Sequence, residues 1–219
     1  MSRTIAVRGV GKCAFAPDTI RIFADIERRD KEYEKALAGS AHAVEKLKAA
    51  LEKQGFSGDD LKTSSFDVNT EYESVRDSDG NYKNVFAGYC VRYNMSLCFE
   101  CDTGKLRKAL SAAAKSGADA RLNISFELNA RNAAVDAALA LAADDAKRKA
   151  AALAGAMGVE LSKIISIEQS GVSHSFVSRT EFREDAVAAR MMKANSAVAD
   201  ISPHDVEIEE SVTVVWEIA

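Results

Sequence analysis

Strict alternation of apolar and polar residues marks the C-terminal stretch of the chain. One side of it carries Val206, Ile208, Glu210, Val212, Val214, Trp216 and Ile218. A period of two predicts a β-strand with one face against a core and the other toward a polar environment. The same alternation predicts strands over 4–16, with a bend at Gly9 and Gly11, and over 19–27, 65–72, 85–100 and 122–128. A shorter apolar run at 164–167 marks one more strand, and residues 73–84 form a polar hairpin loop.

Three segments instead show helical spacing. The first follows Asp30, a possible cap, and ends at Gly55; the second starts at Asp102 or Thr103 and ends at Gly117. The third runs from Asn129 to Met157 and is rich in alanine, which lets its backbone approach a sheet closely. The expected buried stripes are Tyr33, Leu37, Ala41, Val44, Leu47 and Leu51 in the first helix, and Val135, Ala138, Leu139, Ala142, Ala146, Leu153 and Met157 in the third.

These elements follow one another in the order β-β-α-β-β-α-β-α-β-β. Hairpins and two-residue alternation favour antiparallel pairing with helices on one sheet face, which is an α+β fold. We expect a single domain over residues 1–219 with an irregular insertion at about 172–204. That insertion contains a weak helical pattern from about Thr180 to Ala194. A connection of this length inside a compact domain is usually functional, disordered or part of an assembly contact.

Charge and hydropathy exclude two classes of partner. The formal net charge of −4 and the pI near 5.5 argue against nucleic acid, which requires a basic face. No apolar run approaches the length of about 20 residues that a membrane helix needs. The N-terminus enters a strand pattern at once without a secretory signal, which predicts a cytoplasmic protein. The alternative is a periplasmic or secreted protein from which a signal peptide was removed.

No motif in the chain specifies a reaction. Gly9-Val10-Gly11-Lys12 lacks the spacing of a phosphate-binding loop and is interpreted as a strand bend. Cys98 and Cys101 form a CxxC without further ligands of zinc-site spacing, so four free thiols are expected; redox chemistry at this pair is a minor alternative. The acidic pairs Asp144-Asp145 and Glu209-Glu210 are interpreted as solvated faces. We therefore assign no catalytic, cofactor-binding or metal-binding residues and no cofactor.

With these residues in view, the chain resembles the SIMPL-domain family. The resemblance covers nearly its whole length, and the matching segments are 5–11, Pro17-Asp18, 60–68, 87–89, 116–118, 124–126, 143–158 and 212–214. The family includes bacterial periplasmic immunogenic and oxidative-stress-associated proteins and a eukaryotic protein that binds a pelle-like kinase. The resemblance implies an α+β fold, homo-oligomers that are ring-like or channel-like in some members, and a possible link to stress response. It supplies no established catalytic residues.

Two functional hypotheses remain open. The first is a non-enzymatic, self-associating scaffold or binding protein whose partner is another copy, or another protein. Phe23 and Val215, on otherwise polar strand faces, motivate it, because exposed apolar side chains on a sheet mark contacts with other chains. The alternative is a small-molecule-binding sensor or an enzyme with a pocket near residues 172–204. Its polar groups would be His174, Arg179, Arg183, Arg190 and His204.

Overall fold

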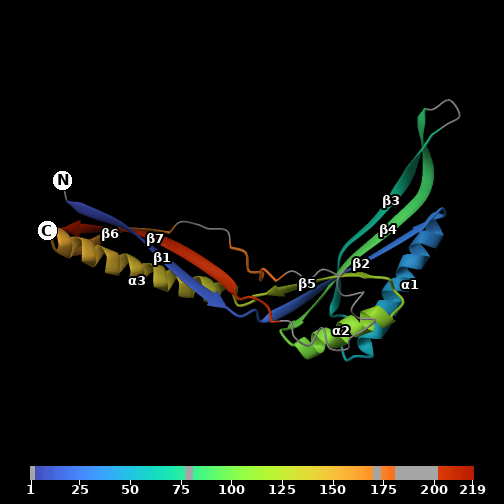
Figure 1. Ribbon diagram of the computed structural model, residues 1–219, viewed down its shortest axis with the longest axis horizontal. Coiled ribbons are helices and arrows are strands. Elements are labelled where there is room, and N and C mark those ends of the chain that lie inside the picture. Colours follow the sequence, from blue (N-terminus) through green and yellow to red (C-terminus); the bar gives the residue numbers. More distant parts are fainter. Residues whose placement is uncertain (1–2, 77–80, 170–173, 181–201) are drawn as a thin grey trace. The chain divides into compact units, whose positions relative to one another are not determined.

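The computed structural model describes residues 3–76, 81–169, 174–180 and 202–219 (Figure 1). The strands are β1 (Thr4–Phe15), β2 (Thr19–Asp30), β3 (Leu61–Arg76), β4 (Tyr82–Glu100), β5 (Arg121–Glu127), β6 (Leu161–Gln169) and β7 (Val206–Ile218); the helices are α1 (Tyr33–Glu52), α2 (Thr103–Lys115) and α3 (Arg131–Met157). The pairings assigned between named strands are antiparallel. The predicted element order and α+β class are therefore confirmed.

The chain divides into two compact units. The α3 unit contains the described residues of 1–18, 126–180 and 203–219. The hairpin unit contains Thr19–Ser125 and is named after its long β3–β4 hairpin. The expectation of one domain over 1–219 stays a prediction, as does the helix near 180–194, nearly all of which lies outside the described residues.

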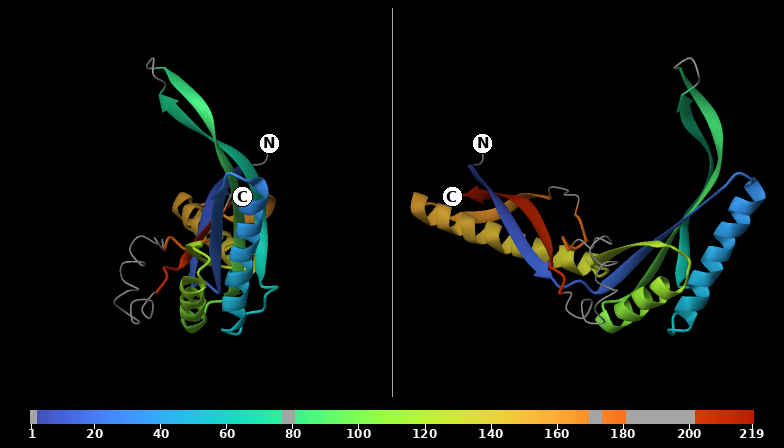
Figure 2. Two further views of the ribbon diagram at one scale, coloured as in Figure 1. Left: turned by 90° about the vertical axis from the view of Figure 1, so that its right-hand side faces the viewer. Right: turned by 45° about the vertical axis from the view of Figure 1, so that its right-hand side comes forward.

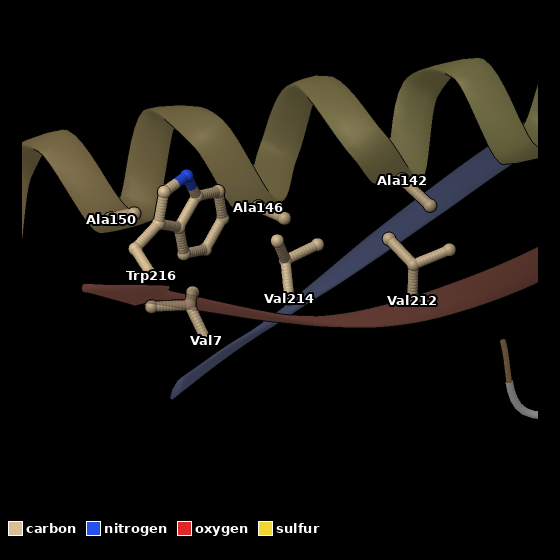
Figure 3. Close-up of a cluster of buried hydrophobic side chains, with 7 residues drawn as sticks. All are labelled: Val7, Ala142, Ala146, Ala150, Val212, Val214 and Trp216. Carbon is tan, nitrogen blue, oxygen red and sulfur yellow. The ribbon is translucent and has the colours of Figure 1, made fainter. Parts of the chain in front are cut away.

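In the α3 unit, β7 lies between β1 and β6, and α3 covers one face of this sheet. The face of α3 toward the sheet is made of alanines four residues apart, each no more than 4% exposed: Ala134, Ala138, Ala142, Ala146, Ala150 and Ala154. Figure 3 shows Val7, Val212, Val214 and Trp216 meeting the central part of this stripe. The predicted stripe was wrong for Leu153 and Met157, which are 48% and 75% exposed. A helix this close to a sheet has room for methyl groups only, so the bulkier residues lie outside the contact.

Gly9 and Gly11 on β1 set this close approach. A Cβ added to Gly9 would lie 2.0 Å from the Ala142 carbonyl oxygen, and one added to Gly11 would lie 2.0 Å from that of Ala138. The interpretation of these glycines as strand backbone, not a phosphate loop, agrees with their place inside β1. Between them, the Val10 N–H donates a 2.9 Å hydrogen bond to the Asp145 carboxylate of α3. Asp145 was expected on a solvated face; its side chain is only 16% exposed because it is held in this contact.

In the hairpin unit the strand order is β3-β4-β2-β5, and α1 packs on β2, β4 and α2. Among its fully buried side chains are Ile20, Ile26, Leu47, Met95 and Leu106. Asp102 accepts hydrogen bonds from the N–H groups of Gly104 and Lys105 and so caps α2 as predicted.

Two predictions about α1 were wrong. The N-cap is Glu32, without a side-chain cap bond, and Asp30 instead ends β2 and accepts a hydrogen bond from the Glu32 N–H. The buried residues are Ala36, Ser40, Ala43, Leu47 and Leu51, so the predicted stripe is correct only in the last turns of the helix. Tyr33 is 47% exposed, where it packs edge-on against Tyr89 of β4. The sheet surface, not the hydrophobicity of individual residues, decides which face of the helix is covered.

The β3–β4 hairpin continues past its neighbour β2. Pairing of β2 with β4 starts at Tyr89, whereas β3 pairs with β4 down to Tyr82. Both views of Figure 2 show this two-stranded end extending beyond α1. We call it the distal ribbon: the described residues 71–76 and 82–88. It replaces most of the polar loop predicted over 73–84, because the strands stay paired as far as Arg76 and Tyr82.

Candidate functional site

The candidate site lies in the α3 unit, where β7 runs past the end of β6. Pairing of β6 with β7 stops at Gln169 and Val212, so the first half of β7 has no β6 neighbour. The described residues 174–180 pass close by. They bond to the end of β5, through the N–H of Leu128 to the carbonyl of Phe176 and the N–H of Ser178 to the carbonyl of Phe126. Phe176 packs against the buried cluster that contains Val206 and Ile208.

A buried pair of polar side chains forms at this point. Glu210 belongs to the alternating side of β7 that carries Ile208 and Val212, and it is paired in register with Gly11. Its side chain is 3% exposed, and that of His174 is 11% exposed. The Nε2 atom of His174 lies 2.5 Å from Oε1 of Glu210, and the imidazole meets the Phe176 ring edge-on. The segment that follows β6 therefore covers an acidic side chain set into an apolar face.

The second oxygen of this carboxylate has no partner. No described residue donates a hydrogen bond to Glu210 Oε2, although the atom is buried. An unsatisfied buried acceptor costs about 1–3 kcal/mol, and more when it is charged. Native structures rarely leave such an atom without a donor. Glu210 is thus a position where the fold carries an energetic cost that the described side chains do not offset.

Beside this pair is a cavity of about 850 Å³. Its lining includes the carboxylates of Asp205, Glu207, Glu209 and Glu210 and the cationic side chains of Arg8, Lys12 and Arg179. The cations are engaged within the protein: Lys12 pairs with Glu209 at 2.8 Å, Arg179 lies 3.6 Å from Glu207, and Arg8 donates a 3.0 Å hydrogen bond to the Ser211 hydroxyl. The contact with Glu209 raises the pKa of Lys12 and keeps it protonated. Cys13 also lines the cavity. Burial raises the pKa of its thiol and so favours the neutral form.

The structure brings together only some of the residues nominated from sequence. His174 and Arg179 line the cavity. His204 contributes its backbone, which bonds to the hydroxyls of Ser178 and Thr180, and is not among the lining residues. Arg183 and Arg190 lie outside the described residues.

Glu210 is the residue that the sequence interpretation misjudged. It was grouped with Glu209 as part of a solvated face, and that was wrong because the two side chains point to opposite sides of β7. Glu209 is exposed, whereas Glu210 is buried. The signal was available: an acidic residue occupies a position whose neighbours two residues away on the strand, Ile208 and Val212, are apolar.

All four cysteines lie in the described part of the chain, and none of them forms a disulfide, as expected. Cys98 and Cys101 are exposed, Cys90 is buried, and Cys13 is half-buried and lines the cavity. Within the described ranges, no group of three or more His, Cys, Asp or Glu side chains is arranged to hold a metal ion. No described helix has the length and apolar composition needed to cross a membrane.

Comparison with known proteins identifies the family. The sequence profile of SIMPL, described as a protein of unknown function (DUF541), matches residues 5–216. The chain belongs to the SIMPL family. The resemblance noted from sequence is therefore confirmed, while the family description assigns no activity to any residue.

The curated relatives are two bacterial proteins. The 26 kDa periplasmic immunogenic proteins of Brucella abortus (strain S19) and Brucella melitensis biotype 1 are each 24% identical to this SIMPL chain over 165 residues, which is 75% of this chain. The match spans 66% of the relatives' own length. Among solved structures, the regulatory subunit of aspartate kinase from Thermus flavus matches with 14% identity over 97% of this chain and 90% of that one. Its TM-score is 0.18, so no conclusion about fold or function rests on it.

Proposed function

We propose that this SIMPL protein is a non-enzymatic, self-associating scaffold or binding protein, and that it self-associates through the distal ribbon. The observation that carries the proposal is the exposure of its apolar side chains. Tyr72, Val75, Tyr82, Val85 and Phe86 are between 43% and 76% exposed. A two-stranded ribbon is at best marginally stable alone in water. Exposed apolar side chains clustered on such an element are typical of contacts with another chain.

Aromatic packing along the ribbon supports a contact between protein chains. Tyr72 packs on Phe86 with ring centroids 6.1 Å apart, and Phe86 packs on Tyr89 at 5.2 Å. Tyr89 in turn contacts Tyr33 at 5.5 Å. These rings hold one another in place before any partner arrives, which lowers the entropy lost on binding. Tyrosine and phenylalanine are also enriched at the centres of protein interfaces.

The sequence pointed to other residues for this role. Phe23 and Val215 are half-buried, so they are weaker candidates for a contact surface than expected. The apolar side chains of the ribbon lie within or beside the predicted polar loop and were not among the residues expected to form a contact. A second set, Ile164, Ile165 and Ile167, is 48–63% exposed on β6, the edge strand of the α3 unit. Unpaired edges of this kind also favour pairing with a sister chain.

The test compares Phe86→Glu with Leu153→Glu by sedimentation velocity and light scattering. Leu153 is an exposed apolar residue on α3, 48% exposed against 43% for Phe86, so both variants add the same charge at similar exposure. Loss of a central aromatic contact typically costs about 2 kcal/mol or more, which is about a thirtyfold weaker association. The Phe86→Glu protein should therefore be monomeric at micromolar concentration, whereas the Leu153→Glu protein should form the same oligomer as the wild type. A wild-type protein that is monomeric at these concentrations would refute the proposal.

We further propose a periplasmic location. It is supported by the names of the Brucella relatives, which are called periplasmic, and these favour the periplasmic alternative over the cytoplasmic prediction. Fractionation of the source bacterium by osmotic shock, with a specific antibody against this protein, tests the point. Recovery with cytoplasmic marker enzymes would contradict it. The link to stress response stays a prediction of the family resemblance.

A further inference from the structure

The cavity beside Glu210 carries an inference independent of self-association, because it lies in the α3 unit and the distal ribbon belongs to the hairpin unit. We infer that this cavity binds a small organic cation, whose protonated amino group donates a hydrogen bond to Oε2 of Glu210. The inference joins a built polar group to a space large enough for a ligand. Pockets that enclose small molecules typically measure about 300–1,000 Å³, and this one measures about 850 Å³.

The unpartnered oxygen determines what the ligand must supply. The side chain of Glu210 is 3% exposed and lines the cavity. Its Oε1 atom already contacts His174. What the site lacks among described residues is one donor at Oε2. An ionised carboxylate accepts most strongly from a charged donor, and an ammonium group provides up to three N–H bonds.

The remaining charges of the lining disfavour an anion. Lys12 and Arg179 already contact Glu209 and Glu207, and Arg8 donates to the Ser211 hydroxyl, so an anion would compete with the partners that these cations already have. Asp205 lines the same cavity and forms no ion pair with a described residue, which leaves acidic capacity for a second positive group. A metal ion is a poorer occupant, because the described residues provide no third ligand beside His174 and Glu210.

His174 leaves one oxygen of Glu210, Oε2, for the amine. Its Nε2 occupies Oε1, and the imidazole is fixed against Phe176, which is itself covered by the Arg131 guanidinium 5.3 Å from the ring centroid. Val177 also lines the cavity, and its exposed side chain offers apolar surface to a short carbon chain. A short aliphatic amine therefore matches both the polar and the apolar parts of the lining.

The experiment uses the full chain and 1,4-diaminobutane as the probe, with butane-1,4-diol as an uncharged molecule of the same length. Binding is measured by isothermal titration calorimetry on the wild type, Glu210→Gln and Glu217→Gln. Glu217 is the control, because it lies on the same strand, β7, and carries the same type of side chain, but does not line the cavity. We expect the diamine to bind the wild type and Glu217→Gln, and to bind Glu210→Gln at least tenfold more weakly. The diol should bind at least tenfold more weakly than the diamine.

Three results would overturn the inference: equal loss of affinity in both variants, equal binding of diamine and diol, or no saturable diamine binding to the wild type. Circular dichroism establishes that Glu210→Gln is folded. Should it not fold, nuclear Overhauser contacts between the diamine methylene protons and the methyl groups of Val177 and Ile208 decide the matter on the wild type. Their presence supports the site, and their absence at saturating diamine refutes it.

Discussion

Replacing Gly9 with alanine is expected to destabilise the α3 unit through a backbone clash. The new Cβ would lie 2.0 Å from the Ala142 carbonyl oxygen and 2.5 Å from the Ala146 nitrogen, whereas ordinary contact begins near 3.4 Å. Both obstacles are helix backbone, so α3 must retreat by roughly 1.4 Å, the difference between 3.4 and 2.0 Å. Overpacking of this kind typically costs about 1–3 kcal/mol of stability. Alanine also restricts the unfolded chain more than glycine does, which stabilises the folded protein by only about 0.4–1 kcal/mol. We expect a net loss of about 1–2 kcal/mol in the free energy of unfolding.

The assay is urea denaturation followed by tryptophan fluorescence. The single tryptophan, Trp216, is buried in the cluster that faces α3, so its emission reports this unit. The control is Gly155→Ala, on the same helix, where an added Cβ meets nothing within 4 Å. That variant should be more stable than the wild type by about 0.5–1 kcal/mol, because alanine is the better helix former. A Gly9→Ala protein as stable as the wild type, with an unchanged urea dependence, would show that α3 does not rest on the strand backbone.

Three further outcomes are expected. Bonds to Lys149 and the Val10 N–H lower the pKa of Asp145 from 3.8 to about 2, so this carboxylate stabilises the fold above pH 4. Wild-type stability should fall toward pH 2 in acid titrations, and Asp145→Asn should lose less stability over that range; the lowered pKa values of Glu27 and Asp102 leave the rest of the dependence in place. Asp102→Ala should lose about 1 kcal/mol in thermal denaturation by circular dichroism, since two α2 N–H groups lose their cap, and an unchanged midpoint would contradict this. A thiol reagent should label Cys98 and Cys101 rapidly in the native protein and Cys90 only on unfolding; rapid native labelling of Cys90 would be contrary.

Local signals in the sequence identified the helices and strands, although not the length of the β3–β4 hairpin or the cap of α1. The period of two in β7 and β4 identified strands, and Asp102 identified the start of α2, because a strand's alternation and a helix cap are properties of neighbouring residues. The same reasoning gave the right order of elements and the α+β class. It also assigned Gly9 and Gly11 to a strand and not to a phosphate-binding loop, because the spacing of such a loop is a local property.

Contacts between distant segments decided the rest. The alanine stripe of α3 is buried in place of Leu153 because the glycines of β1 let the helix come close. The two elements are distant in the sequence: Val10 and Asp145, which are hydrogen-bonded across this contact, are 135 residues apart. Phe86 is exposed because β2 stops pairing with β4 at Tyr89. The sequence of the β3–β4 hairpin alone does not reveal where β2 ends. His174 and Glu210 meet across 36 residues. The sequence by itself determined which segments are strands and helices, because that depends on short-range geometry. Only the tertiary structure decided which side chains are buried, exposed or paired, because burial depends on what another part of the chain places over them.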